Sequence, residues 1–427
     1  MTTRAARLLS TIDRAADGLA ADAGLYLLSA AFALVTGLTS TLLPHRGWGL
    51  IAVWAYVAAF AVVVIQLLLR RPAGRMLLTW VAWAGVALVP LIVEAVQRAG
   101  GRTDRAQDEV LVVEQMGERL LHAGTPYLGP DAIAALPPAA RLLGYSPYQP
   151  GMAVFGLPRA VAGDAWWTDA RVWFAVATGA ALIAAVSTLR ADGASGVPPF
   201  AGRRDALVRA LQFATVLPIC ALTLATGGDD LPVLALCLLA LAWCAADRFG
   251  AAGVAVGAAA ACKLFAFPVV AVLAVLAIAT GRGRRLLPGA LGLPILVLIP
   301  PLLVNGDAFV ENVVRFPLGH GIVQSPAQSP FPGYLISTGV PGGRYFAAAL
   351  LVAVAGAVAV VLVRRPPRTA ATAALFCGYG LLAAILLMPT TRFGYLLYPV
   401  ALLVWAPALR NPTGTTAPRG DAALYRV

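Results

Sequence analysis

Charged residues are scarce in this sequence, making up 12% of its 427 residues, whereas a soluble globular domain has about a quarter. Cysteines are also few: five occur, all in apolar segments, without the short paired spacings of a disulfide framework or a zinc site. The formal net charge is +12, but its Arg residues lie in short clusters between apolar runs instead of forming one basic face. These features exclude an ordinary soluble domain and give no indication of nucleic-acid binding.

Long apolar runs are abundant, and hydrophobic residues make up 60% of the chain. A helix needs about 20 predominantly apolar residues to cross the hydrocarbon core of a bilayer. Runs close to that length predict an all-α polytopic membrane protein. They lie near Leu25–Leu43, Trp48–Leu69, Met76–Val96, Val172–Leu189, Leu207–Thr226, Leu231–Ala246, Leu286–Val304, Tyr345–Val363, Thr369–Met388 and Gly394–Leu409.

Arginine clusters between the runs predict the orientation. Arg70 and Arg71 follow the second run, and Arg364 and Arg365 separate two later ones. Loops rich in Lys and Arg are usually cytoplasmic, so both termini, residues 1–23 and the flexible tail 410–427, are expected in the cytoplasm. The first apolar run is expected to be a retained span, since no small-residue cleavage site follows it.

The segment Phe249–Thr280 tests this orientation, because basic residues flank it on both sides, Arg248 before it and Arg282 after it. A single crossing would place one of these cations on the wrong face. Two shorter helices folded back at Lys263, with Pro268 just beyond, would keep both in the cytoplasm. The alternative is one long span in which Lys263 extends to an interface. The hairpin is favoured, and it raises the expected total to about twelve helices.

The expected domain organisation follows from this topology. The ranges are N-terminal transmembrane helices at 24–97, an extracytoplasmic loop with interfacial helices at 98–171, and a transmembrane bundle at 172–409 with an outer loop at 305–344. Within the first loop, Val110–Leu121 has the apolar spacing of a helix. Gly151–Val161 is too short to span and predicts an interfacial helix.

Carboxylates open the helix predicted in the first loop. Asp108 and Glu109 could simply stabilise the helix dipole. At the mouth of a membrane cavity, however, a desolvated carboxylate becomes a better proton acceptor, so both are candidate catalytic bases. Glu94, at the end of the third apolar run, is a secondary candidate for lining the same cavity.

Isolated cations on the expected outer face are candidates for holding an anionic group such as a phosphate. They are Lys263 at the hairpin tip, Arg392, and with weaker support Arg315. The alternative is that such residues anchor helix ends at the interface. Asp229–Asp230 could bind a divalent cation, but capping of the following helix is the better interpretation.

Aromatic residues in turn-rich segments could stack on sugar rings. Tyr145 and Tyr148 lie in the segment Gly144–Gly151, and Tyr127 follows the first-loop helix. His320 is a further candidate for lining the acceptor side of the cavity. The three histidines have no ligand spacing, so no metal site is expected.

Several of these motifs together resemble the GT-C membrane glycosyltransferases, and in particular glycosyltransferase family 87, the actinobacterial mannosyltransferases that use polyprenyl-phosphate mannose. The first-loop pattern of an acid, a short apolar helix, Gly and Pro-Tyr matches Asp108 through Tyr127. The Tyr-x-Pro-x-x-Pro-like segment matches Tyr145–Pro150, and the Gly-rich helix ending in Lys matches Gly253–Lys263. The likeness covers roughly Ala106 to Pro407.

The resemblance implies a GT-C-like bundle in the plasma membrane with its active face outside the cell. It implies an inverting single displacement, in which an outer-face carboxylate, either Asp108 or Glu109, takes the proton from an acceptor hydroxyl. The donor is a polyprenyl-phosphate sugar, the acceptor a lipid or glycan, and neither a cofactor nor a divalent metal is indicated. A transporter or a non-catalytic carrier of a lipid-linked sugar remains the alternative.

Overall fold

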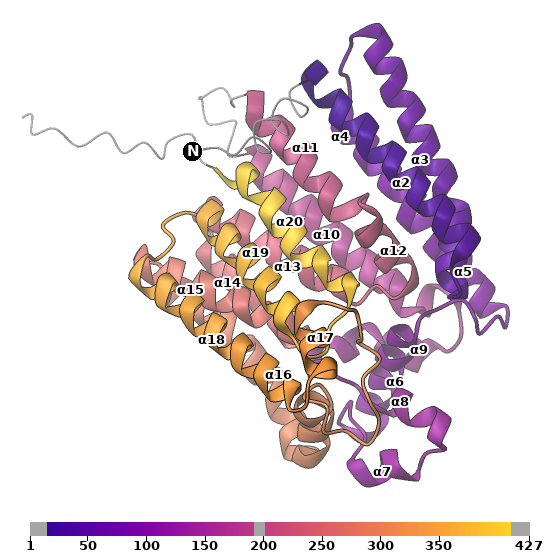
Figure 1. Ribbon diagram of the computed structural model, residues 1–427, viewed down its shortest axis with the longest axis vertical. Coiled ribbons are helices and arrows are strands. Elements are labelled where there is room, and N and C mark those ends of the chain that lie inside the picture. Colours follow the sequence, from indigo (N-terminus) through magenta and orange to yellow (C-terminus); the bar gives the residue numbers. More distant parts are fainter. Residues whose placement is uncertain (1–14, 192–200, 411–427) are drawn as a thin grey trace, which may run out of the picture.

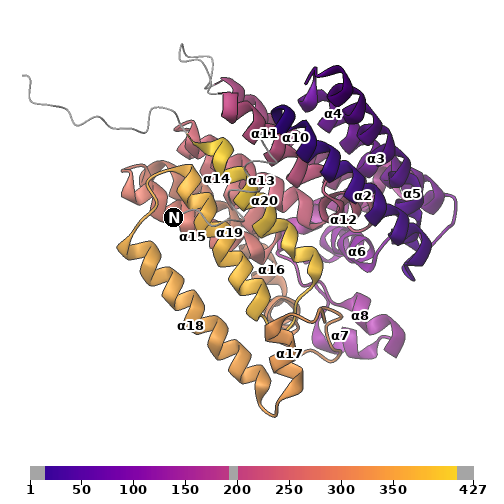
Figure 2. The same cartoon turned by 45° about the horizontal axis from the view of Figure 1, so that its top comes forward.

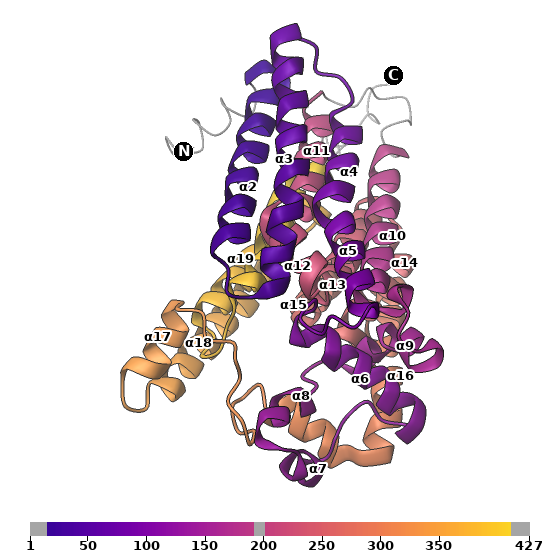
Figure 3. The same cartoon turned by 90° about the vertical axis from the view of Figure 1, so that its right-hand side faces the viewer.

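The computed structural model describes residues 15–191 and 201–410 and shows an all-helical chain (Figure 1). Long helices run side by side, and a group of short helices, α6 to α9, lies at one end of them (Figure 3). The predicted all-α polytopic architecture is confirmed. The predicted tail 410–427, beyond Arg410, and most of the segment 1–23 lie outside the described residues.

The N-terminal helices form a group of their own, in which α2 (Leu19–Thr39) packs along α3 (Leu43–Leu69) (Figure 2). The close approach depends on glycine, because a Cβ atom on Gly49 would lie 2.4 Å from the backbone nitrogen of Gly37. Next, α4 (Arg75–Trp83) passes through a π-helical turn into α5 (Val89–Ala99).

Short helices make up the first long loop. They are α6 (Asp108–Ala123), α7 (Pro130–Ala135), η3 (Pro138–Ala140), α8 (Arg141–Gly144), η4 (Pro150–Phe155), α9 (Leu157–Ala162) and η5 (Trp166–Thr168). The helix predicted over Val110–Leu121 is confirmed as α6, which ends at Gly124 in the left-handed conformation. The single helix predicted over Gly151–Val161 is wrong in detail, because the chain breaks into η4 and α9 at Gly156. There a Cβ atom would lie 2.1 Å from the carbonyl oxygen of Val113.

The central helices follow the loop. They are α10 (Ala170–Ala191), α11 (Ala201–Thr215), α12 (Pro218–Thr226), α13 (Asp230–Ala245), α14 (Phe249–Cys262), α15 (Phe267–Ala279) and α16 (Gly283–Phe309). The chain between α14 and α15 breaks at Lys263, whose backbone is extended. Arg282 Nε lies 2.9 Å from Asp247 Oδ1, and this ion pair joins the start of α14 to the end of α15. This geometry confirms the predicted hairpin over a single long span.

The C-terminal part begins where α16 bends at Asn305 and continues as a π-helical segment, Val310–Arg315. The bend lies at the start of the predicted outer loop 305–344, so helical structure continues into that loop. The remaining elements are α17 (Pro332–Gly339), α18 (Gly343–Arg364), α19 (Ala370–Leu387), η9 (Phe393–Leu396), α20 (Leu397–Trp405) and η10 (Ala406–Leu409).

The described residues contain seven helices long and apolar enough to cross a membrane, or eight if the bent pair α11–α12 is one span. The protein is therefore a multi-pass membrane protein. The expected count of about twelve crossings is not confirmed, because four of the expected crossings are apolar helices of 10–17 residues. A helix of 16 residues such as α13 covers about 24 Å, less than the hydrocarbon thickness of about 30 Å.

Candidate active site

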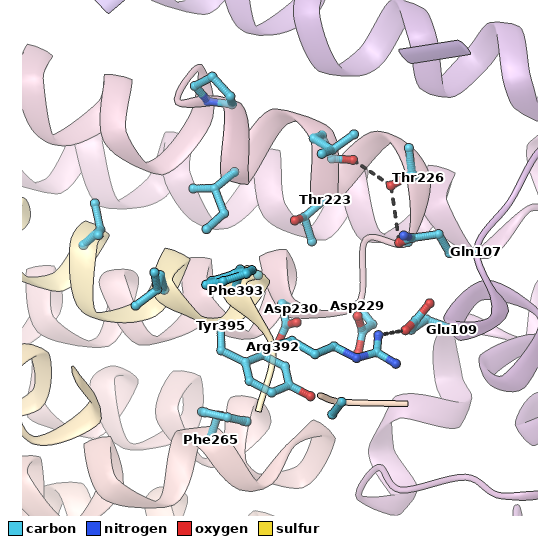
Figure 4. Close-up of a pocket in the computed structure, with 18 of the residues that line it drawn as sticks. Gln107, Glu109, Thr223, Thr226, Asp229, Asp230, Phe265, Arg392, Phe393 and Tyr395 are labelled. Atoms are coloured by element: carbon cyan, nitrogen blue, oxygen red, sulfur yellow. Dashed lines mark hydrogen bonds and ion pairs between the residues drawn. The ribbon is translucent and has the colours of Figure 1, made fainter. Parts of the chain in front are cut away.

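A cavity of about 1610 Å³ opens between the N-terminal helices, the α6 helix and the C-terminal part of the bundle. Its polar end contains acids and cations from four separate segments, and Figure 4 shows Arg392 reaching towards Glu109 with Asp229 and Asp230 beside it. The rest of the lining is mostly apolar. Of the predicted site residues, those that line the cavity are Asp108, Glu109, Tyr145, Tyr148, Lys263 and Arg392.

The two predicted acids stand at the start of α6. The backbone N–H of Gln107 donates to the carbonyl oxygen of Thr226 at 3.0 Å, which ties this helix start to the end of α12. Glu109 forms an ion pair with Arg392. Asp108 is solvent-exposed in the cavity and has no ion pair among the described residues. Partial burial and the neighbouring charge of Glu109 raise the pKa of Asp108.

Lys263 faces the cavity, but two carboxylates hold its ammonium group. Its Nζ lies 2.6 Å from Asp229 Oδ2 and 2.6 Å from Asp230 Oδ1, and Tyr398 donates to the same Asp230 oxygen at 2.7 Å. The capping interpretation of Asp229–Asp230 is therefore wrong. The pair stands at the start of α13, but Asp229 makes no side-chain cap hydrogen bond, because both carboxylates turn to Lys263.

Of the three predicted phosphate-binding cations, the two that line the cavity, Lys263 and Arg392, differ in their remaining capacity to bind an anion. The single charge of Lys263 faces two aspartates, and its side chain is 9% exposed. Arg392 has one carboxylate partner and a side chain that is 37% exposed. A guanidinium carries five N–H donors, so Arg392 has capacity left for an anion and Lys263 has little.

Aromatic rings line the polar end of the cavity. The Tyr148 and Tyr395 rings lie 5.3 and 5.7 Å from Lys263 Nζ, within cation–π distance. Tyr145 stacks on Phe316 with ring centroids 4.2 Å apart. Its hydroxyl donates to Glu311 Oε1 at 2.8 Å, which fixes the ring where it meets the cavity.

Four of the predicted site residues do not line the cavity. Arg315 has a side chain that is 60% exposed beside Glu311, and His320 is exposed on the loop that follows. Tyr127 is buried, and its hydroxyl donates to the carbonyl oxygen of Tyr148 at 2.7 Å, so it helps to hold the backbone of a residue that lines the cavity. Glu94 is buried and pairs with Arg171 at 3.1 Å. In each case, the fold turns the side chain to a partner or to the outer surface.

Glu94 belongs to a buried charge network that holds α6 in place. Arg171 also contacts Asp169 at 2.8 Å, and Arg98 joins Asp169 at 2.9 Å to Glu114 of α6 at 2.5 Å. Burial opposes ionisation of Asp169, but Arg171 and Arg98 outweigh it and lower the pKa of Asp169 to about 2. The network fixes the helix that presents Asp108 against α5 and α10.

The sequence prediction missed several residues of the site. His45 and Gln107 line the cavity and lie 2.5 Å apart through their Nε2 atoms, yet both are isolated in sequence. Tyr395 and Phe265 also line it. Their proximity to the predicted residues Arg392 and Lys263 was the available signal.

The comparison with protein families decides the classification. The model that matches is glycosyltransferase family 87, and the match runs over residues 146–389, more than half of the chain. The chain belongs to glycosyltransferase family 87. The match includes Tyr148, Lys263 and the Asp229–Asp230 pair but begins after Asp108 and Glu109.

Two solved structures are similar to this family 87 chain over part of their length. ArnT from Cupriavidus metallidurans in the apo state has a TM-score of 0.45, 18% identity and coverage of 77% of this chain and 58% of its own. The same protein bound to undecaprenyl phosphate has a TM-score of 0.43, 17% identity and coverage of 77% and 59%. The chain thus spans less than two thirds of ArnT. No curated protein matches the sequence.

Proposed function

We propose that this family 87 glycosyltransferase moves a sugar from a polyprenyl-phosphate donor to a hydroxyl group of a lipid or glycan acceptor. One observation carries the proposal: an exposed carboxylate, a guanidinium with free capacity and a deep apolar groove open into the same cavity. Such a cavity suits a substrate with a sugar, a phosphate and a long apolar chain. The resemblance drawn from the sequence favours mannose as the sugar and the extracytoplasmic face as the site of reaction.

Asp108 is the proposed base. It is exposed in the cavity, whereas Glu109 is paired with Arg392. An acceptor hydroxyl loses its proton to Asp108 while its oxygen attacks the anomeric carbon. The bond between that carbon and the phosphate oxygen breaks, and the electron pair leaves with polyprenyl phosphate, so the configuration is inverted. The raised pKa of Asp108 makes it a stronger proton acceptor.

Arg392 is the proposed phosphate ligand. Its guanidinium can keep Glu109 as one partner and offer its remaining donors to the leaving phosphate. This arrangement would hold the departing oxygen close to the helix that carries the base. Lys263 is assigned a positioning role, since it holds the start of α13 to the hairpin tip through Asp229 and Asp230.

The test is a transfer assay with purified protein in nanodiscs, labelled polyprenyl-phosphate mannose and a membrane lipid extract as the acceptor source. Wild-type protein should form a labelled lipid or glycan product and release polyprenyl phosphate. The same assay with polyprenyl-phosphate glucose or arabinose tests the sugar. Movement of the intact donor across a vesicle membrane without bond cleavage would instead identify a transporter.

A further inference from the structure

One face of α2 forms a wall of the cavity over much of the helix. The lining residues recur at intervals of three and four, which places them on a single face. They are Ala20, Ala21, Gly24, Leu25, Leu28, Ser29 and Phe32. The twelve helical steps from Ala20 to Phe32 correspond to about 18 Å. The cavity therefore extends from the polar end well along the membrane-spanning part of α2.

The opposite walls are mostly apolar, with Arg209 and Thr223 as polar lining residues among them. They come from the end of α11, the start of α12 and the η9–α20 segment, with apolar lining residues Phe213, Leu217, Ile219, Leu222, Leu396 and Val400. A sugar or a glycan chain would leave its hydroxyl groups without partners between such walls. A hydrocarbon chain would lose no hydrogen bonds there.

Ion pairs fix the start of the α2 wall, and the chain beyond its other end leads to a residue of the site. At its start, Asp22 is buried and contacts Arg75 at 2.6 Å and Arg209 at 3.0 Å, which ties α2 to α4 and α11. Beyond its other end, His45 at the start of α3 lies 2.5 Å from Gln107, next to the acids of α6. The side chains on this face of α2 therefore contribute to the width of the groove.

Gly24 stands in the middle of this wall. A Cβ atom built there would meet no other atom within 4 Å, so a larger side chain would extend into open space within the cavity lining. The neighbouring lining residues Ala20 and Ala21 are also small. Moreover, α2 lies outside the residues matched by the family model, so the groove is completed by a segment that the match does not include.

We propose that α2 is a selectivity element for the donor, and that the space at Gly24 accommodates the distal part of its polyprenyl chain. This inference rests on the proposed function, because it takes the phosphate of the donor to lie at Arg392. A chain attached to that phosphate would enter the groove directly from the polar end of the same cavity. A short chain would end before Gly24, and a long chain would pass it.

The test compares Gly24→Leu with Gly356→Leu. Gly356 is a matched control, since it also lies in a membrane-length helix, also has no atom within 4 Å of a built Cβ, and does not line the cavity. Binding of decaprenyl phosphate and of farnesyl phosphate is measured by tryptophan fluorescence, which requires no catalysis. The same variants are then assayed with decaprenyl- and farnesyl-phosphate mannose.

Gly24→Leu is expected to weaken decaprenyl phosphate binding at least about tenfold, a change of about 1.4 kcal/mol, and to leave farnesyl phosphate binding unchanged. Gly356→Leu should change neither. Leu28→Phe, which narrows the same groove without altering a glycine or adding a tryptophan, is the second variant in case Gly24→Leu folds poorly, and it should reproduce the effect. Equal loss for both chain lengths, no loss for either, or a rise only in the acceptor KM would overturn the proposal. If Gly24→Leu weakens decaprenyl phosphate binding alone, as expected, but the wild-type protein transfers no sugar, only the proposed function is refuted.

Discussion

Replacement of Asp108 by Asn tests the proposed base most directly. Removing a positioned general base lowers kcat by about 10²- to 10⁴-fold, or about 3–5 kcal/mol in activation free energy. Folding should be little changed, because Asp108 is exposed and has no ion pair among the described residues. Glu109→Gln would lose only the partly exposed pair with Arg392. Such pairs contribute about 0.2–1 kcal/mol, so Glu109→Gln should lower kcat about fivefold or less.

The pH profile gives a second, independent signature of Asp108. Its pKa is raised in the substrate-free protein, so the base is active above that pKa, and kcat/KM should fall as the pH drops through it, at a pH above about 3.9, the ordinary value of Asp. This acid limb should disappear in the residual activity of Asp108→Asn. Asp131→Asn, an exposed Asp-to-Asn change on α7 outside the cavity lining, is the matched control.

The assay is initial-rate transfer in nanodiscs with saturating donor, together with thermal unfolding of each variant. If Glu109→Gln loses about 10²-fold or more in kcat while Asp108→Asn keeps most of its activity, the roles assigned to the two acids are reversed. If neither variant loses activity, the base lies elsewhere in the cavity and the reasoning from exposure and pairing is refuted.

Three further changes have distinct expected outcomes. Arg392→Lys should raise the donor KM by about tenfold or more with little change in thermal stability, since Lys lacks the forked geometry for two anions; an unchanged KM would place the phosphate elsewhere. Lys263→Met should lower the free energy of unfolding by about 3–5 kcal/mol, because it leaves two buried carboxylates without their cation. Adding Asp229→Asn and Asp230→Asn should restore part of the loss. A Lys263→Met variant as stable as the wild type would contradict this pairing. Gly49→Val should destabilise by about 1–3 kcal/mol, since any Cβ there overlaps the backbone of α2, and a normal unfolding temperature would show that the helices can separate.

The sequence predicted those features that depend on charge and periodicity along the chain. Basic residues on both sides of Phe249–Thr280 predicted the break at Lys263, and the apolar spacing of Val110–Leu121 predicted α6. These features are local, so no knowledge of lateral packing was needed. The count of crossings was less well determined, because apolar composition does not distinguish a full span from a short helix buried among its neighbours.

Ion pairs between residues far apart in the sequence could not be predicted in the same way. The expectation that Lys263 binds phosphate treated it as an isolated cation, but helix packing brings Asp229 and Asp230 to it. Glu94 was expected at the cavity, yet packing of α5 against α10 gives it Arg171 as a partner. An ionisable residue in a membrane protein indicates that a partner exists, and only the three-dimensional arrangement shows which one.

The charge balance of the cavity makes Arg392 the residue on which the proposed chemistry depends most. At the polar end, four carboxylates (Asp108, Glu109, Asp229 and Asp230) face two cations, Lys263 and Arg392. Two of the carboxylates already occupy Lys263, so an arriving phosphate has Arg392 as its remaining cation at that end. Because Arg392 also holds Glu109, the residue next to Asp108, a phosphate bound to it would lie beside the base. One guanidinium would then position the leaving group and the proton acceptor together. For this reason Arg392→Lys should impair donor use although it keeps the positive charge.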